Sequence, residues 1–212
     1  MKKIAVLISG QGSNLQAIIE ACLTGFIPGK IVTVISNKID SFGLERAKSA
    51  GIPSRVFLRQ DFSSNLAMDK AIGDYLDALN IDLIVLAGYM KILTKPFTQR
   101  FAGKILNIHP SLLPKYPGLH TYQRAFENGD SEHGTTVHFV NEEIDGGAIV
   151  LQAKVPIFPG DTVEEIELRT REQEYNIYPL VIKWFIEDRL KLIENQAYLD
   201  GKLLPPNGYA YE

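Results

Sequence analysis

Three residues in the second half of the chain have side chains suited to acyl transfer. Asn107 and His109 stand two positions apart at the end of an apolar run, and Asp145 precedes a pair of glycines. Residues two apart in a strand point to the same face. An amide, an imidazole and a carboxylate together can stabilise a tetrahedral oxyanion and move a proton. We therefore predict that Asn107, His109 and Asp145 form a catalytic centre for acyl transfer, which needs no nucleophile from the protein if the acceptor is an amine.

Each of these residues also has an ordinary structural interpretation. A single histidine beside a proline is commonly structural, and an aspartate before Gly146 and Gly147 commonly forms a turn. A catalytic role is favoured over a structural one because His109 lies at the end of a predicted strand. Open parallel sheets bind ligands at the carboxyl ends of their strands. We expect the two glycines to permit backbone turns that other residues cannot make.

A second candidate site is the glycine loop, residues 9–14, which follows the first apolar run. A helix is expected to begin at its end, and a helix N-terminus favours anions. Leu15 stands where a dinucleotide fingerprint needs glycine or alanine, and no Gly-Lys-Ser/Thr tripeptide occurs, which disfavours NAD and ATP. We predict that Gly12, Ser13 and Asn14 bind a monophosphate. A plain turn with Ser13 or Asn14 as N-cap is the alternative.

The elements that position these residues alternate along the first half of the chain. Short runs rich in isoleucine and valine are separated by segments with helical apolar spacing, a pattern typical of parallel βαβ units. We predict an α/β fold with a doubly wound, mostly parallel sheet and flanking helices in a single domain. The expected strands are residues 3–8, 30–36, 55–58, 82–87 and 104–108, and the expected helices are residues 14–24, 42–50, 66–79 and 94–101.

The second half of the chain is expected to add further strands, a long helix and a hairpin. Asp161 or Thr162 is expected to cap the helix, and Pro179 to kink it. The expected strands are residues 135–140 and 149–157, the helix runs to about residue 188, and the hairpin turn lies at residues 200–201.

Composition restricts the partners and the cellular location. The chain has 212 residues, of which 45% are hydrophobic, and a formal net charge of -3, which gives no reason to expect nucleic acid or membranes as partners. Its one cysteine, Cys22, excludes an internal disulfide and a cysteine-rich zinc site. No apolar run reaches membrane-spanning length or resembles a secretion signal. These features predict a cytoplasmic protein.

Three motifs give the chain a family resemblance. Residues 6–14 (Val-Leu-Ile-Ser-Gly-Gln-Gly-Ser-Asn), 106–114 (Leu-Asn-Ile-His-Pro-Ser-Leu-Leu-Pro) and 133–138 (His-Gly-Thr-Thr-Val-His) resemble the phosphoribosylglycinamide formyltransferases, a folate-dependent formyltransferase family. The resemblance covers essentially the whole chain and implies a Rossmann-like formyltransferase fold. It also implies transfer of formyl from 10-formyltetrahydrofolate, as co-substrate, to the amine of phosphoribosylglycinamide in de novo purine (IMP) biosynthesis. Neither metal nor ATP is implied, and the protein would be a monomer or homodimer.

The resemblance also implies a role for each site residue. Asn107 and His109 would hydrogen-bond the oxyanion, and Asp145 would favour the protonated imidazole and order a water that relays the proton to folate. Residues 1–212 would form one formyltransferase domain, with residues 1 to about 100 binding phosphate and about 101–212 carrying catalysis and folate binding. The substrate would contact Gly12, Ser13, Asn14, Arg171 and Glu174; folate would contact Met90, Lys91, Ile92, Leu93, Asn107, Asn141, Glu142, Glu143, Ile144 and Asp145.

Some of these positions differ from the pattern of the family or have another interpretation. Glu174 would by itself be interpreted as a solvated helix carboxylate. Lys91 stands where relatives often have arginine, and Asn65 where some have an arginine near the glutamate tail of folate. The alternatives are a methionyl-tRNA formyltransferase, expected to carry a further C-terminal domain, a formyltetrahydrofolate hydrolase, expected to carry a further N-terminal one, and a non-catalytic nucleotide-binding module.

Overall fold

The computed structural model describes residues 1–209 of the chain. It divides into two compact units, Met1–Asn107 and Ile108–Glu212. The boundary falls inside β5 (Ile105–His109), the strand that carries Asn107 and His109. Among the described residues, no helix combines the length and the apolar character needed to cross a membrane.

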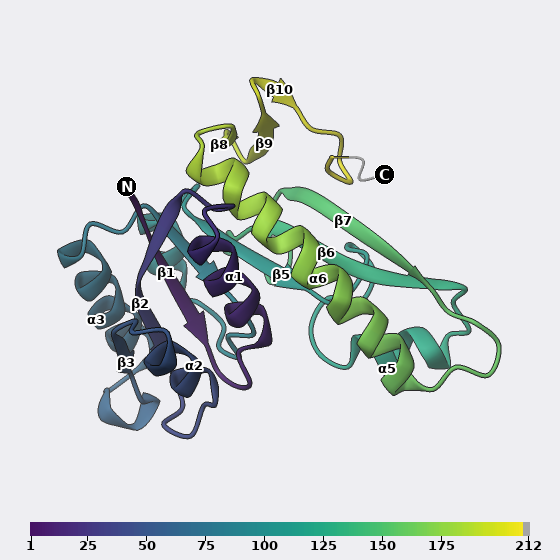
Figure 1. Cartoon of the computed structure of the whole chain (residues 1–212), viewed down its shortest axis with the longest axis horizontal. Helices are drawn as coiled ribbons and strands as arrows, with labels where there is room; N and C mark the ends of the chain where they lie inside the picture. The colour runs from purple at the N-terminus through teal and green to yellow at the C-terminus, as the bar shows by residue number, and fades with distance from the viewer. Residues whose placement is uncertain (210–212) are drawn as a thin grey trace. The chain divides into compact units, whose positions relative to one another are not determined.

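The first unit is built on a parallel sheet with strand order β3-β2-β1-β4-β5 (Figure 1). Its central strands are almost entirely apolar, and residues such as Ile4 and Val85 are fully buried, as expected for a sheet covered on both faces. The strands are β1 (Lys2–Ile8), β2 (Gly29–Ser36), β3 (Ser54–Val56), β4 (Leu83–Leu86) and β5.

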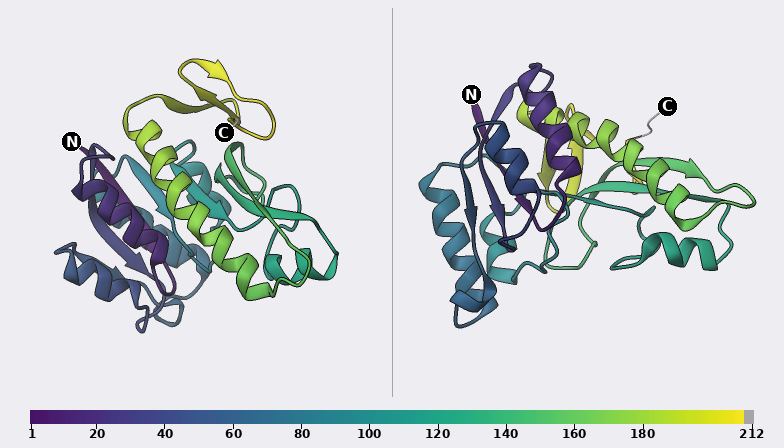
Figure 2. Two further views of the ribbon diagram at one scale, coloured as in Figure 1. Left: turned by 45° about the vertical axis from the view of Figure 1, so that its right-hand side comes forward. Right: turned by 60° about the horizontal axis from the view of Figure 1, so that its bottom comes forward.

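Helices cover both faces of this sheet. α1 (Ser13–Leu23) and α2 (Gly43–Ser49) pack together on one face, and α3 (Asn65–Ala78) packs with α4 (Lys95–Arg100) on the other (Figure 2). The strand order reverses between β3 and β4, and right-handed crossovers place the later helices on the opposite face. The predicted strands and helices of residues 1–107 are therefore all present, within a few residues of their expected bounds.

The second unit joins two antiparallel strands to one long helix. β6 (Glu132–Phe139) pairs with β7 (Ile149–Pro156), and α6 (Val163–Ile186) packs against both strands (Figure 1). A small antiparallel sheet follows, with order β10-β9-β8, and contains the predicted hairpin. The sequence reasoning missed α5 (Thr121–Glu127) and the first strand of this sheet; the sheet comprises β8 (Leu190–Ile193), β9 (Gln196–Leu199) and β10 (Lys202–Leu203).

Thr162, one of the two predicted residues, is the N-cap of α6. Its hydroxyl accepts a hydrogen bond from the Glu165 N–H at 3.2 Å. Asp161 instead accepts two hydrogen bonds from Arg169, at 2.7 and 2.6 Å, which leaves the cap position to its neighbour. The helix continues through Pro179 to Ile186.

Candidate active site

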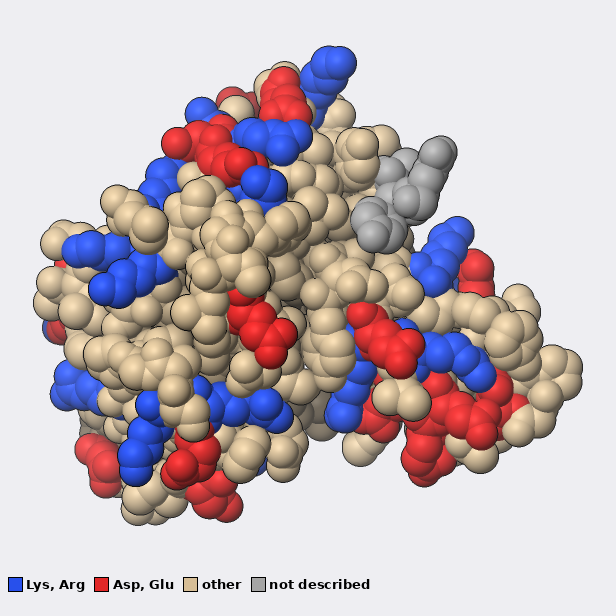
Figure 3. All heavy atoms as spheres, viewed as in Figure 1, with Lys and Arg blue, Asp and Glu red and all other residues tan. Residues whose placement is uncertain are grey.

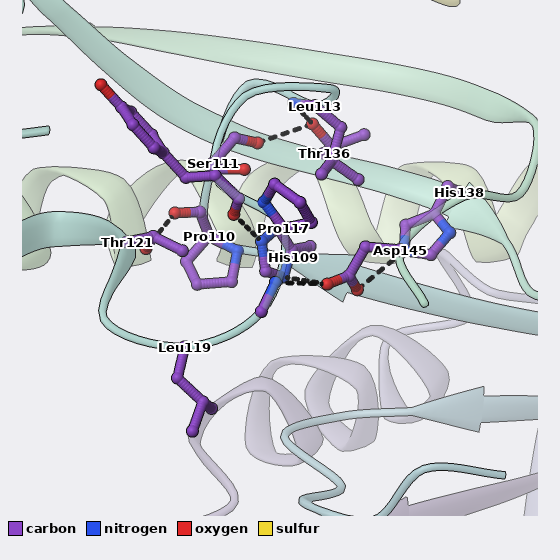
Figure 4. A network of polar contacts seen from close by, with 12 residues as sticks. His109, Pro110, Ser111, Leu113, Pro117, Leu119, Thr121, Thr136, His138 and Asp145 are labelled. Atoms are coloured by element: carbon purple, nitrogen blue, oxygen red, sulfur yellow. Dashed lines mark hydrogen bonds and ion pairs between the residues drawn. The ribbon is translucent and has the colours of Figure 1, made fainter. Parts of the chain in front are cut away.

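His109 and Asp145 lie next to each other in the second unit (Figure 4). Asp145 Oδ2 is 3.5 Å from His109 Nδ1, and their side chains are only 11% and 7% exposed. His109 ends β5, and Asp145 lies in the turn that connects β6 to β7. The carboxylate therefore faces the imidazole, as the sequence predicts.

The loop after β5 holds both side chains in place. His109 Nε2 lies 2.8 Å from the Tyr116 carbonyl, and because a carbonyl can only accept, Nε2 is the donor. The Gly118 N–H donates to Asp145 Oδ2 at 2.9 Å. With Nε2 turned to the Tyr116 carbonyl, Nδ1 is the ring nitrogen that faces the Asp145 carboxylate.

The backbone of the Asp145 turn differs from the expectation. Asp145 itself has the left-handed conformation, with φ 52°, whereas neither Gly146 nor Gly147 has a positive φ. Aspartate adopts this conformation more readily than most residues. A Cβ on Gly147 would lie 1.7 Å from the Phe139 carbonyl oxygen. Glycine is thus required at position 147 for close packing against β6, so other residues cannot follow this path, as expected. The positive φ of the turn, however, lies at Asp145 and not at the glycines.

His138 is a residue of this site that the sequence reasoning quoted in a motif without giving it a role. It is buried at the end of β6, and its Nδ1 donates to the Phe139 carbonyl at 2.8 Å. Its Nε2 lies 3.9 Å from Asp145 Oδ1, so the carboxylate stands between two imidazoles (Figure 4). Burial lowers the pKa of His138 and favours its neutral form. The strand that carries it leads directly into the turn of Asp145, and this was the signal that could have placed it near the site.

Asn107 belongs to the first unit and is half-buried in β5, two residues before His109. The placement of its amide beside His109, which the alternation of side chains along a strand predicts, stays a prediction.

In the first unit, the glycine loop (residues 9–14) passes into α1 at Gly12, which is the N-cap of this helix with φ 72°. The alternative of Ser13 or Asn14 as N-cap is therefore wrong. As a glycine, Gly12 has no side chain to cap the helix, and no acidic residue lies in its first turn, so no side-chain carboxylate in that turn opposes an anion at the helix N-terminus. A Cβ on Gly12 would lie 2.8 Å from Gly43 Cα, which makes glycine necessary there.

The glycine loop is held by the start of α2 and by the residues just before it. The Gly43 N–H donates to the Gly10 carbonyl at 3.0 Å, and Ser41 Oγ donates to the same oxygen at 3.2 Å. Arg46 Nε donates to the Gln11 carbonyl at 2.7 Å and brings a guanidinium to the loop. Sequence reasoning missed Arg46, because no local pattern links residues 35 positions apart.

Glu174 differs from the other charged residues of α6 because it is buried. Acidic and basic side chains gather on the surface around the first half of this helix (Figure 3), and Arg171 pairs with Glu167 at 2.5 Å while remaining half exposed. Glu174 is only 6% exposed. The Thr135 hydroxyl lies 3.0 Å from both Glu174 Oε2 and the His109 carbonyl. The interpretation of Glu174 as a solvated carboxylate is therefore wrong, since the helix turns it toward β6.

Comparisons with known proteins identify the family. The model of the family described as formyl transferase matches residues 2–182. The chain belongs to the formyl transferase family. It is 76% identical over 212 residues to a phosphoribosylglycinamide formyltransferase of Haemophilus influenzae, covering 100% of both chains. It is 57% identical to the Escherichia coli K12 protein of the same name, covering 98% of each.

Solved structures of the family agree with the fold. The phosphoribosylglycinamide formyltransferase of Coxiella burnetii, solved in complex with CHES, has a TM-score of 0.96 and 44% identity, and the match covers 100% of this chain and 99% of that one. The predicted fold class is confirmed: a mostly parallel sheet of seven strands with flanking helices in a single-domain formyltransferase fold. As a formyltransferase, the protein is an enzyme that transfers a one-carbon group.

The residues expected to contact folate fall into two groups. In the first unit, Met90 and Ile92 are 60% and 68% exposed, while Lys91 forms an ion pair with buried Asp69. In the second unit, the Asn141 side chain accepts from the Glu143 N–H at 2.9 Å. This hydrogen bond helps to shape the turn that ends at Asp145. Ile144 is 59% exposed, and Glu142 and Glu143 lie in the same turn.

Proposed function

We propose that this formyltransferase transfers the formyl group of 10-formyltetrahydrofolate to the amine of phosphoribosylglycinamide, a step of de novo purine (IMP) biosynthesis in the cytoplasm. One observation carries the proposal: the His109 imidazole faces the Asp145 carboxylate at 3.5 Å in a chain of the formyl transferase family. The names of the two bacterial relatives, which match over nearly all of their length, support the choice of acceptor.

The chemistry follows from what these groups can donate and accept. The substrate amine attacks the formyl carbon, and the carbonyl oxygen becomes an oxyanion that the Asn107 amide and the His109 imidazolium hydrogen-bond. The C–N bond to folate then breaks, and a water ordered by Asp145 relays the amine proton to the departing nitrogen. Because His109 Nε2 donates to the Tyr116 carbonyl, that hydrogen bond must be exchanged for one to the substrate.

Substrate binding is assigned to two places. The glycine loop with Gly12, Ser13 and Asn14 at the N-terminus of α1 would bind the phosphate. Glu174, with Arg171 on the same helix, would bind the ribose and amine end. In this proposal residues 1 to about 100 supply phosphate binding, and the remainder supplies catalysis and most of the folate contacts. No step uses a metal ion or ATP.

An assay of the purified protein tests this assignment. Product tetrahydrofolate formation is followed spectrophotometrically with 10-formyltetrahydrofolate and phosphoribosylglycinamide. Parallel reactions contain water alone or methionyl-tRNA as acceptor. We expect turnover only with phosphoribosylglycinamide. No turnover with that acceptor would reject the proposal, and turnover in water or with the tRNA would indicate the hydrolase or the tRNA enzyme instead.

Glu174→Gln is expected to raise the KM for phosphoribosylglycinamide about tenfold, with a smaller effect on kcat, because the amide keeps the Thr135 hydrogen bond but lacks the charge. Steady-state kinetics with varied acceptor measure it. Glu172→Gln, an exposed position on the same helix, is the matched control. Equal KM values for wild type and Glu174→Gln would remove Glu174 from the substrate site.

A further inference from the structure

The segment that connects β4 to α4 contains residues 90–93 and has no helix or strand. It nevertheless presents Met90 and Ile92 to solvent, at 60% and 68% exposure. Exposed large apolar side chains can contribute fully to ligand binding only if the backbone that carries them is already held in place. Ordering a mobile loop costs conformational entropy, and this cost weakens binding. The contacts at the two ends of this segment show how it is held.

Asp69 holds the C-terminal end of the segment. Its Oδ2 accepts hydrogen bonds from Thr94 N and Thr94 Oγ1, each at 2.7 Å, and its Oδ1 pairs with Lys91 Nζ. The Asp69 side chain lies on the buried face of α3 and is 1% exposed. A buried carboxylate is costly unless it is paired and hydrogen-bonded. All three of these donors come from residues 91–94, so the carboxylate and the segment depend on each other.

Thr94 departs from the usual behaviour of a residue that begins a helix. It is the N-cap of α4, a position where a threonine hydroxyl normally accepts a hydrogen bond from its own helix. Here its side chain makes no cap hydrogen bond and donates to Asp69 instead. The Thr94 hydroxyl therefore does not stabilise its own helix. Its hydrogen bond to Asp69 links the segment to α3.

The N-terminal end of the segment is held by a different residue. The Met90 N–H donates to Ser9 Oγ at 2.7 Å, and Ser9 Oγ donates to Asn37 Oδ1 at 2.6 Å. Ser9 is buried and directly follows β1. The segment of residues 90–93 is thus tied by hydrogen bonds at both ends, through Ser9 at one and Asp69 at the other.

We propose that Asp69 is a positioning residue for folate binding, a role that rests on the proposed function. It does not touch folate; it fixes the backbone of residues 91–94, so that their N–H and carbonyl groups face the pteridine edge between exposed apolar side chains. Its contribution is made before the ligand arrives, by removing the need to order the segment on binding.

The test replaces the carboxylate by an amide of the same shape. In Asp69→Asn an NH2 group must face either the Lys91 ammonium or the Thr94 donors, so at least one link is lost. We expect the KM for 10-formyltetrahydrofolate to rise about tenfold, with kcat at saturating folate and the KM for the acceptor nearly unchanged. Calorimetry with tetrahydrofolate should show the same loss of affinity. Backbone hydrogen exchange of residues 91–93 should become faster.

Two further variants separate positioning from general stability. Asp74→Asn changes another aspartate of α3, which is 53% exposed and pairs with Lys70 and Arg100, and it should leave the folate KM unchanged. If Asp69→Asn does not fold, Thr94→Val removes only the hydroxyl link, and a smaller rise in the folate KM is expected. Unchanged melting temperatures beside a raised folate KM would support positioning.

Several outcomes would overturn the proposal. A folded Asp69→Asn, or failing that Thr94→Val, with unchanged tetrahydrofolate affinity and unchanged exchange at residues 91–93 would reject it, as would a lower kcat with unchanged folate KM. The proposed function is tested separately by wild-type turnover with phosphoribosylglycinamide. A wild type that binds tetrahydrofolate without that turnover still tests Asp69 by calorimetry and exchange, whereas a wild type that does not bind tetrahydrofolate rejects both.

Discussion

Asp145→Asn is expected to lower turnover by about 10²-fold or more while the protein stays folded. The carboxylate lies 3.5 Å from His109 Nδ1, and no other carboxylate is close enough to His109 among the described residues to form an ion pair with it. An asparagine of the same shape can still accept the Gly118 N–H but carries no charge to favour imidazolium and binds a relay water less strongly. Single-turnover rates at saturating substrates measure the change.

The matched control for this variant is Asp130→Asn. Asp130 accepts a 2.6 Å hydrogen bond from the Tyr116 hydroxyl and so contacts the same loop without contacting His109. A turnover loss much smaller than that of Asp145→Asn is expected, because an asparagine can still accept that bond. Equal losses in the two variants would mean that loop order, not the Asp145 charge, matters. An unchanged rate in Asp145→Asn would discard its role in proton transfer.

Gly12→Val is expected to abolish saturation with phosphoribosylglycinamide in the accessible range, a loss of about 10²-fold or more in kcat/KM. Valine is strained at φ 72°, and its Cβ would lie 2.8 Å from Gly43 Cα, so the loop must move away from α2. Movement of the loop disturbs the N–H groups that would bind the phosphate. The valine side chain would also fill the space of the anion. The loss of phosphate binding therefore has two causes, this filled space and the contact with Gly43.

Gly25→Val controls for backbone strain alone. Gly25 has φ 80°, and no atom lies within 4 Å of the position that a Cβ would take, so its substitution carries the left-handed strain without the clash. Melting temperatures and acceptor KM values of both variants separate stability from binding. If Gly12→Val is unfolded, Gly12→Ala provides the milder change. A folded Gly12 variant with wild-type acceptor affinity would remove the glycine loop from the phosphate site.

The strands and helices of the first unit could be predicted from the sequence because their patterns are local. Ile4 to Ile8 form an uninterrupted buried run, and Leu15, Ile18 and Ile19 recur with helical spacing and are all buried. α5 was missed because three prolines and a glycine precede it in residues 110–118, which made the whole region look like a loop.

Some residues of the candidate site could likewise be predicted from local patterns, and others could not. Alternation along a strand predicted that Asn107 and His109 share one face. The glycine pair after Asp145 indicated a turn at that residue. The roles of these residues stay predictions until the variants are measured. His138 and Asp69 received no role, because an isolated histidine in a strand and an isolated aspartate in a helix look the same whether they contact a site or solvent.

The sequence by itself determined the family, the order of the elements and the residue types able to carry formyl transfer, since motifs and hydrophobic periods are properties of neighbouring residues. Only the tertiary structure decided that the Asp145 carboxylate faces His109, that Glu174 is buried against Thr135, and that Asp69 holds residues 91–94. These contacts join positions 22 to 39 residues apart. Their geometry depends on how packed elements meet, and no local pattern records that.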